Sequence, residues 1–269
     1  MFLYRVIMSL FMALTCFLGS HPVARATTLP SYLAVYALAL DQAATQSGLV
    51  GASGSMTIEW QDACDAWSSV QHVTINLDDV SGNIIEINSR YASWESKDGL
   101  VFQFDVRNSR DGSLDEQFNG RATLSSQGGP GRVVYSAPED KILDLPKSTV
   151  FPSEHLFLLL DAAKKGEKIL SRIVFDGASE EGMSEINAVI GSLTPVETPN
   201  AKLDSSLNTK YWPMRLAFFS MKAGVDLPDY ETTAHLLENG IAWGLLLDYG
   251  NFKIRGTLDK VEFPPKPSC

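Results

Sequence analysis

Alternation of apolar and polar residues at a period of two is the feature that most constrains the fold of this chain. In one clear example, Met56, Ile58 and Trp60 are apolar and are separated by Thr57 and Glu59. A period of two is typical of strands with one buried face. The pattern returns in residues 73–77, 102–106, 118–124, 211–219, 230–237, 241–249 and 252–263.

Turn-forming dipeptides separate these alternating segments, among them Gly82-Asn83, Asp111-Gly112 and Asn239-Gly240. Glycine, asparagine and aspartate tolerate the positive φ angles that tight antiparallel hairpins require. The sequence therefore predicts a mainly β fold, built as a long antiparallel meander.

One segment has a helical period instead. An apolar stripe at i, i+3, i+4 and i+7 runs from Leu156 to Ala163, with Ser153 placed as N-cap and Gly166 just beyond the end. This arrangement predicts a helix over about residues 153–165, with its apolar face on the sheet or across a barrel mouth. Residues 29–46 fit a strand followed by a short helical turn, and residues 192–209 read as a loop that could mark a domain boundary.

The N-terminus has the pattern of a secretory signal peptide. Arg5 precedes an apolar run from Val6 to Leu18, and Ala24-Arg25-Ala26 matches a small-x-small cleavage site. This run is shorter than the roughly 20 residues that a membrane-spanning helix needs, and no later segment is long and apolar enough. We expect residues 1–26 to be removed and the mature chain to be exported. As an alternative, the residues around Cys16 loosely resemble a lipoprotein box.

Cysteine usage fits an oxidising compartment. With Cys16 in the signal peptide, only Cys64 and Cys269 remain, and a bridge between them would close a loop of about 205 residues. Unpaired or intermolecular thiols are the alternative. Neither cysteine has C-x-x-C spacing, so a catalytic thiol is not expected.

Composition and motifs exclude several functions. Acidic residues outnumber basic ones by 32 to 22, for a formal charge of −10, which disfavours nucleic acid and anionic membrane surfaces as partners. His72, His155 and His235 lack metal-ligand spacing and are expected at surface or helix-end positions. The segment from Gly51 to Ser55 departs from G-x-S-x-G and precedes a strand. Calcium ligation by residues 105–115 would lack the EF-hand order. We expect no enzyme activity, catalytic residue, cofactor or metal.

The tryptophans indicate the architecture. All five fall in or beside expected strands: Trp60, Trp67, Trp94, Trp212 and Trp243. Most should be core residues. A sheet of a dozen or more strands that curls on itself encloses more volume than side chains fill. A carrier of a lipid or other apolar envelope ligand is therefore one functional hypothesis.

Several short motifs, in their order and spacing, resemble one known family. They are the segment Gly54 to Trp67 (GSMTIEWQDACDAW), Phe151-Pro152-Ser153-Glu154-His155, Ala163 to Lys168, Phe175-Asp176-Gly177, Tyr211-Trp212-Pro213, Glu238-Asn239-Gly240, Asp248-Tyr249-Gly250 and the final Cys269. Over nearly all of the mature chain, the sequence resembles the EipB family of periplasmic cell-envelope integrity proteins. Ala66 stands where that family has glycine.

The resemblance implies a single domain over residues 27–269, folded as a spiral-like open β-barrel of about 12–14 strands with one packed helix. It also implies a Cys64–Cys269 disulfide, periplasmic residence and no known catalysis. Family members maintain the envelope under stress and are linked to a periplasmic protein with tetratricopeptide repeats. A non-enzymatic scaffold is thus the leading hypothesis, ahead of the apolar carrier and, third, an envelope hydrolase.

Overall fold

The computed structural model describes residues 29–197, 200, 202–207, 209–221, 226–265 and 269. The predicted signal peptide at 1–26, its cleavage site at Ala26 and Cys16 lie outside these residues.

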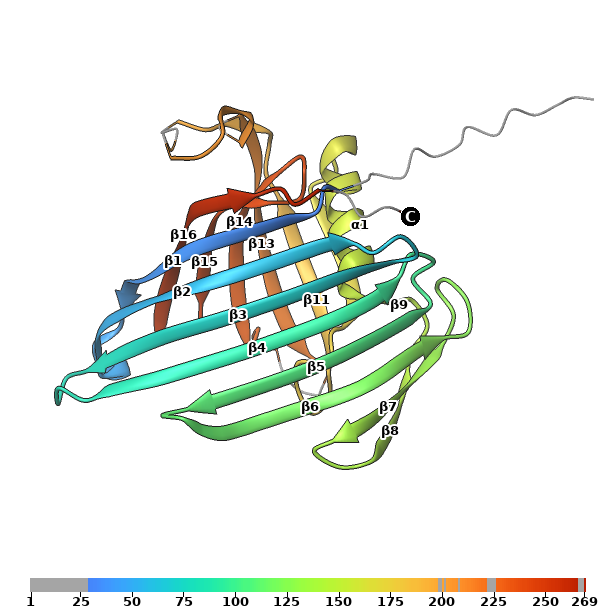
Figure 1. Cartoon of the computed structure of the whole chain (residues 1–269), viewed down its shortest axis with the longest axis horizontal. Coiled ribbons are helices and arrows are strands. Elements are labelled where there is room, and N and C mark those ends of the chain that lie inside the picture. Colours follow the sequence, from blue (N-terminus) through green and yellow to red (C-terminus); the bar gives the residue numbers. More distant parts are fainter. Residues whose placement is uncertain (1–28, 198–199, 201, 208, 222–225, 266–268) are drawn as a thin grey trace, which may run out of the picture.

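Sixteen strands of the described chain form one sheet (Figure 1). The first half consists of β1 (Tyr32–Ala43), β2 (Leu49–Asp62), β3 (Ala66–Asp79), β4 (Ile84–Ser96), β5 (Val101–Arg110), β6 (Ser113–Leu124), β7 (Gly131–Ala137) and β8 (Lys141–Leu145). The second half consists of β9 (Thr149–Val150), β10 (Ile169–Phe175), β11 (Met183–Ile190), β12 (Thr194–Pro195), β13 (Lys210–Ser220), β14 (Tyr230–Leu237), β15 (Ala242–Asp248) and β16 (Phe252–Glu262). The helices are η1 (Thr45–Ser47), α1 (Pro152–Lys165) and η2 (Ser205–Leu207).

The strand order is that of a meander folded back on itself. It runs β8-β7-β6-β5-β4-β3-β2-β1-β16-β15-β14-β13-β11-β10-β9, with β12 paired to β13 beside this path. All pairs are antiparallel except β9–β10. In Figure 1, β2–β6 run across the front and the strands of the second half stand behind them. The two halves join where β1 pairs with β16, while β8 and β9 end the path, so the barrel is nearly closed and has a seam.

The predicted antiparallel meander and open barrel are confirmed, with more strands than the 12–14 expected. Two of the additional strands, β9 and β12, are only two residues long and carry no alternation. Residues 29–46 form strand β1 and the short helix η1, as predicted. In its described residues, the expected loop at 192–209 holds only β12 and η2. Strand β11 pairs with β13 across it, so the sheet continues past this point.

Helix α1 begins differently from the prediction. Ser153 is not the N-cap, because Phe151 holds that position and Pro152 is the first residue of the helix. The Glu95 carboxylate of β4 instead accepts hydrogen bonds from the backbone N–H groups of Ser153 (2.7 Å) and Glu154 (3.0 Å). A side chain from a distant strand thus satisfies donors that a helix leaves free at its start. The end is as predicted, with Gly166 at a left-handed φ of 77°.

Two ends of the barrel differ in what closes them. At the end that we call the turn end, hairpins meet: Ala44 N–H bonds Asn251 O at 2.8 Å and Val80 N–H bonds Gly48 O at 2.9 Å. The opposite end, the disulfide end, carries the β2–β3 turn with Cys64, and helix α1. There the Phe157 ring of α1 lies 5.3 Å from the ring of Trp67.

The core has two parts. The larger packs α1 against inward-facing side chains of β1–β3, β10, β11 and β13–β16. The smaller is aromatic and lies under β5–β8, with Phe102, Phe151 and Phe175 fully buried. Among the tryptophans, Trp60, Trp67 and Trp212 are buried as expected, whereas Trp94 and Trp243 are half-buried.

The loop between β10 and β11 lies across the seam. Tyr91 Oη donates to the backbone oxygen of Asp176 at 3.0 Å, and Tyr135 Oη to that of Ser179 at 3.4 Å. Gly177 has a φ of 67°, and a Cβ there would lie 2.5 Å from the Phe104 ring. Only glycine suits both this conformation and this close approach.

Candidate functional site

The two predicted site residues, Cys64 and Cys269, are joined by a disulfide. Their Cα atoms lie 5.8 Å apart, a normal separation for a bridge. Cys64 has a φ of 68°, and its backbone N–H donates to Oδ1 of Asp62 at 3.2 Å. Both cysteines of the described chain are therefore used in a structural link that fastens residue 269 to the β2–β3 turn.

An apolar cavity occupies the turn end of the barrel interior. It has a volume of about 330 Å³ and lies between inward-facing side chains of β1–β4 and those of β15 and β16. Its walls include Leu38, Met56, Val73, Ile75, Ile87, Leu247 and Ile254. Ser89 and Tyr249 supply the polar groups of the lining. A space of this size and character suits an apolar group better than a charged one.

A row of stacked aromatic rings runs across β13–β16 at the turn end and borders the cavity. The ring centroids of Phe218 and Tyr230 are 4.2 Å apart, those of Tyr230 and Tyr249 6.2 Å, and those of Tyr249 and Phe252 5.0 Å. Tyr249 and Phe252 also line the cavity. Because 47% of Tyr249 is exposed, this wall reaches from the interior to solvent.

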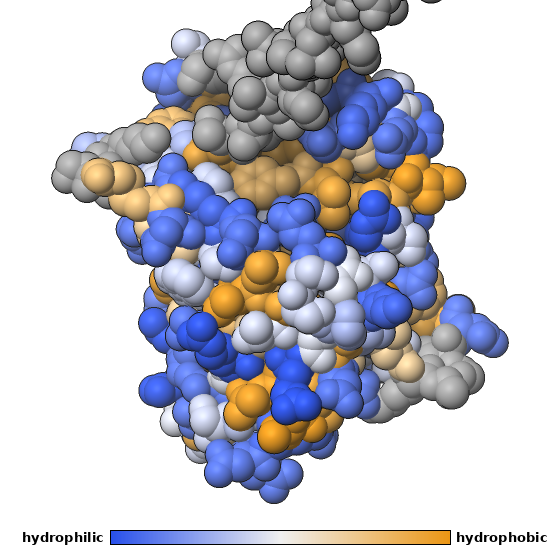
Figure 2. Space-filling model, turned by 90° about the vertical axis from the view of Figure 1, so that its right-hand side faces the viewer, coloured by the Kyte–Doolittle hydropathy of each residue, from blue (hydrophilic) through white to orange (hydrophobic). Residues whose placement is uncertain are grey.

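Exposed apolar side chains surround the same end. Val50 follows the β1–β2 turn, Val80 and Ile84 flank the β3–β4 turn, and Leu114 follows the β5–β6 turn. Together with Tyr249 we call these residues the apolar rim. Clustered exposed apolar residues commonly mark a site of interaction. By contrast, the side of the molecule shown in Figure 2 carries hydrophobic residues in separate patches between hydrophilic ones.

The acidic residues at the turns have structural roles. Oδ1 of Asp79 accepts hydrogen bonds from the N–H groups of Ser81 and Asn83, each at 2.8 Å. Oδ1 of Asp111 accepts one from Glu86 N–H at 2.9 Å, and Asp115 pairs with Arg110. Asp105, the remaining carboxylate of the segment 105–115, pairs with Arg90 at 3.0 Å. The described residues contain no group of three or more His, Cys, Asp or Glu side chains that could hold a metal ion.

Burial shifts the pKa of several titratable groups, among them Glu95, Asp176 and His155. Burial raises the pKa of Glu95 to about 7, against the hydrogen bonds from the start of α1. Burial also raises the pKa of Asp176 to about 6, and Oδ1 of Asp176 accepts a hydrogen bond from Ala178 N–H at 2.8 Å. Burial lowers the pKa of His155 to about 4, with a further lowering by Arg172. Glu95 binds the start of α1, Asp176 binds within the loop between β10 and β11, and His155 lies in the first turn of α1.

The three histidines of the described residues lie on three different elements, β3, α1 and β14. His72 is exposed on β3 and His235 lies half-buried on β14. His155 stands in the first turn of α1, as expected for a helix-end residue, but it is buried rather than at the surface. No helix within the described ranges is long and apolar enough to cross a membrane.

Comparisons with known proteins agree with this architecture. The family model described as EipB-like matches residues 23–265. The chain is 30% identical over 252 residues to the cell envelope integrity protein EipB of Brucella abortus (strain 2308), covering 91% of this chain and 88% of that protein. The crystal structure of a β-barrel-like protein of a domain of unknown function from Brucella abortus superposes with a TM-score of 0.80 at 28% identity. This superposition covers 88% of this chain and 99% of the other. The chain therefore belongs to the EipB-like family.

Proposed function

We propose that this protein supports the integrity of the cell envelope from the periplasm, as a binding protein without catalytic activity. The observation that carries the proposal is the 30% identity, across 91% of the chain, to a protein named for that role. The predicted signal peptide at 1–26 supports export. The Cys64–Cys269 disulfide suits an oxidising compartment.

Deletion of the gene tests the envelope role. We expect the deletion strain to become sensitive to detergents and to other agents that stress the envelope, and the full-length gene to restore resistance. A copy lacking residues 1–26 should not restore it, because that protein would stay in the cytoplasm. Normal resistance in the deletion strain, or full rescue by the leaderless copy, would contradict the proposal.

The leading partner is a periplasmic protein with tetratricopeptide repeats, as the family resemblance implies. Such repeats stack into a solenoid with an extended concave surface. The apolar rim supports a docking site at the turn end, because Val50, Val80, Ile84 and Leu114 are exposed and lie on successive hairpins. Burial of such side chains is the main favourable term in protein association.

Site-specific photocrosslinking in cells tests this docking site. A photoreactive residue replaces Ile84 on the rim, which is 64% exposed. The matched control replaces Ile169, which is 71% exposed and begins β10, at the end of that strand opposite the loop between β10 and β11. We expect a protein containing tetratricopeptide repeats to crosslink at position 84 and not at 169. Equal crosslinking at both positions, or none at 84, would argue against the rim.

A second candidate function is carriage of a lipid or other apolar ligand, and the observation that favours it is the cavity of about 330 Å³. Apolar walls from two sides of the barrel would surround a hydrocarbon group, and the aromatic row at Tyr249 would form its entrance. Transfer of hydrocarbon surface from water to such a site is favourable by about 25 cal/mol per Å².

Native mass spectrometry of freshly purified protein tests the carrier function. A lipid adduct should be present in the wild type and absent from Val73→Phe, which places an aromatic ring in the cavity. Val70→Phe is the matched control, because Val70 lies on the opposite face of β3 from Val73. An adduct that persists in Val73→Phe, or wild-type protein without any adduct, would exclude the cavity as a lipid site.

A further inference from the structure

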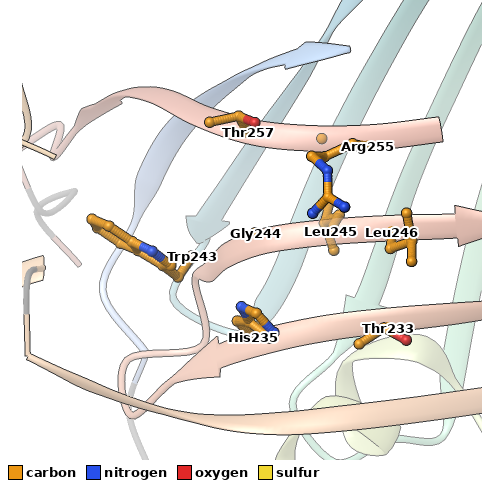
Figure 3. Close-up of a pocket in the computed structure, with 9 residues that line it drawn as sticks. Thr233, His235, Trp243, Gly244, Leu245, Leu246, Arg255 and Thr257 are labelled. Atoms are coloured by element: carbon orange, nitrogen blue, oxygen red, sulfur yellow. The ribbon is translucent and has the colours of Figure 1, made fainter. Parts of the chain in front are cut away.

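A second hollow lies outside the barrel, on the outer face of β14, β15 and β16 (Figure 3). Its volume is about 260 Å³. The strand register places Gly244 opposite Thr257, and Leu246 opposite both Thr233 and Arg255. These residues face away from the interior, where Leu245, Leu247 and Ile254 point. We call this hollow the outer groove.

The outer groove exists because β15 has a glycine, Gly244, on its outer face. A Cβ atom at Gly244 would find nothing nearer than Nδ1 of His235 at 3.8 Å and the backbone oxygen of Gly256 at 3.9 Å. Figure 3 shows Arg255 and His235 reaching toward β15 from the strands on either side of it. The missing side chain therefore leaves open space between a guanidinium and an imidazole.

Polar side chains around the outer groove are available to a ligand. Nε and Nη2 of Arg255 both bind Asp41, which holds the guanidinium in place. The ring of His235 stacks on Tyr211, with centroids 4.2 Å apart, so its orientation is fixed as well. Among the described residues, no hydrogen bond or ion pair occupies Nη1 of Arg255, the imidazole nitrogens of His235, or the hydroxyls of Thr233 and Thr257.

The charges of the outer groove balance. Asp41 neutralises Arg255, and the neighbouring carboxylates of Glu231 and Asp248 pair with Arg215 and Lys253. Burial, and then the charge of Arg255, lowers the pKa of His235, so the imidazole is neutral at pH 7. A neutral imidazole offers one donor and one acceptor. The outer groove thus has no excess of positive charge that would select a phosphate.

Trp243 supplies a flat apolar surface at one end of the outer groove (Figure 3). A sugar ring has an apolar face of C–H groups and a periphery of hydroxyls that both donate and accept hydrogen bonds. The outer groove offers a matching combination: an indole for the apolar face of the sugar, and a guanidinium, an imidazole and threonine hydroxyls for its hydroxyl groups. We propose that the outer groove binds a neutral sugar, of the hexose or N-acetylhexosamine type.

Saturation-transfer NMR and tryptophan fluorescence on the purified mature protein test this site. The probes are N-acetylglucosamine, its β-1,4-linked trimer, maltotriose and, as an anion, inorganic phosphate. We expect saturable binding of at least one saccharide with a dissociation constant of about 1 mM or tighter, a standard free energy near −4 kcal/mol. Tighter binding of a trimer than of the monosaccharide would indicate a glycan chain as the ligand.

Two substitutions in the outer groove and one control outside it locate the binding. Gly244→Val fills the outer groove without a clash of its Cβ and should abolish binding, whereas Ser53→Val, on an exposed position of β2, should leave it unchanged. His235→Phe keeps the stack on Tyr211, loses both ring nitrogens and should weaken binding at least tenfold. Thermal melting verifies that each variant is folded. Absence of saccharide binding, binding of phosphate alone, or unchanged affinity in both Gly244→Val and His235→Phe would overturn the proposal.

Discussion

The two ends of the barrel are built from the same alternating strands, yet only one of them is filled. At the disulfide end, Phe157 of α1 packs against the stacked, inward-facing rings of Trp60 and Trp67, and Phe102 is fully buried against Phe151. At the turn end no helix of the described residues fills the interior, and a cavity of about 330 Å³ remains. A barrel of many strands is too wide for its own side chains to fill. A separate element must complete the core, and the end without one is available for binding.

The largest effect should come from truncating the filled end. Phe102→Ala removes a ring with no exposed surface that stacks on Phe151 at 5.1 Å, and should cost about 3–5 kcal/mol of unfolding free energy. Phe252→Ala removes a half-buried ring beside the existing cavity and should cost less than half as much. Urea unfolding of both variants measures the difference. Equal losses would mean that the turn end is as well packed as the disulfide end.

The next-largest loss of stability should come from removal of the disulfide. Cys64→Ser should cost about 2–4 kcal/mol under oxidising conditions, because the unfolded chain loses the constraint of a bridge that spans 205 residues. Reduced wild type and reduced variant should melt at nearly the same temperature. Hydrogen exchange should show faster opening at the β2–β3 turn than at the turn end. A variant that melts like the oxidised wild type would show that the bridge contributes no stability.

Glu95 makes the filled end sensitive to pH. Its folded pKa, about 7, lies above the ordinary value of 4.5, so between these values the folded state holds a proton that the unfolded state has lost. The contribution of Glu95 to stability is therefore lost as the pH rises from about 4.5 to 7, by up to about 3 kcal/mol. Over the same range Asp176, with its raised pKa, acts in the same direction, and His155, with its lowered pKa, acts in the opposite one.

The variant Glu95→Gln isolates this effect from the other two groups. At pH 4.5 the variant and the wild type should unfold with similar free energies, since both side chains are uncharged in the folded state. By pH 8 the variant should be the more stable one, because it has no buried charge to solvate. A difference that stays constant over this range would mean that Glu95 keeps an ordinary pKa.

The smallest effect should come from the apolar rim. Ile84→Ser changes an exposed side chain, and should alter the unfolding free energy by no more than about 0.5 kcal/mol. Chemical denaturation measures this value. A loss of more than 1 kcal/mol would mean that Ile84 packs within the fold, so the rim would not be a surface reserved for a partner.

The strands of this protein could be predicted because alternation is a local signal. The segments expected at 211–219, 230–237 and 252–263 agree with β13, β14 and β16 within one or two residues at each boundary. The helix C-terminus at Gly166 was equally predictable, since a left-handed residue ends α1 within its own sequence.

Features that depend on distant residues could not be predicted. Glu95 contacts the start of α1 from a position 58 residues earlier, and nothing near Ser153 indicates that contact. The cavity is similar: alternation predicts that Met56 and Val73 face inward, but which part of the interior α1 fills depends on the whole fold. Gly244 lies within a predicted strand, yet its neighbours in the outer groove come from two other strands.

The pairing of β1 with β16 has a consequence for how the chain reaches its final form. Leu33 of β1 lies opposite Glu262 of β16. One edge of β1 therefore stays unpaired until β16, the last strand, has been synthesised. Contacts this distant in sequence slow folding, and an unpaired edge can join another chain in the meantime. We infer that a chain still lacking β16 cannot close the barrel. Until β16 is made, the uncovered edge of β1 leaves an interval in which a holding chaperone would protect the nascent sheet from aggregation.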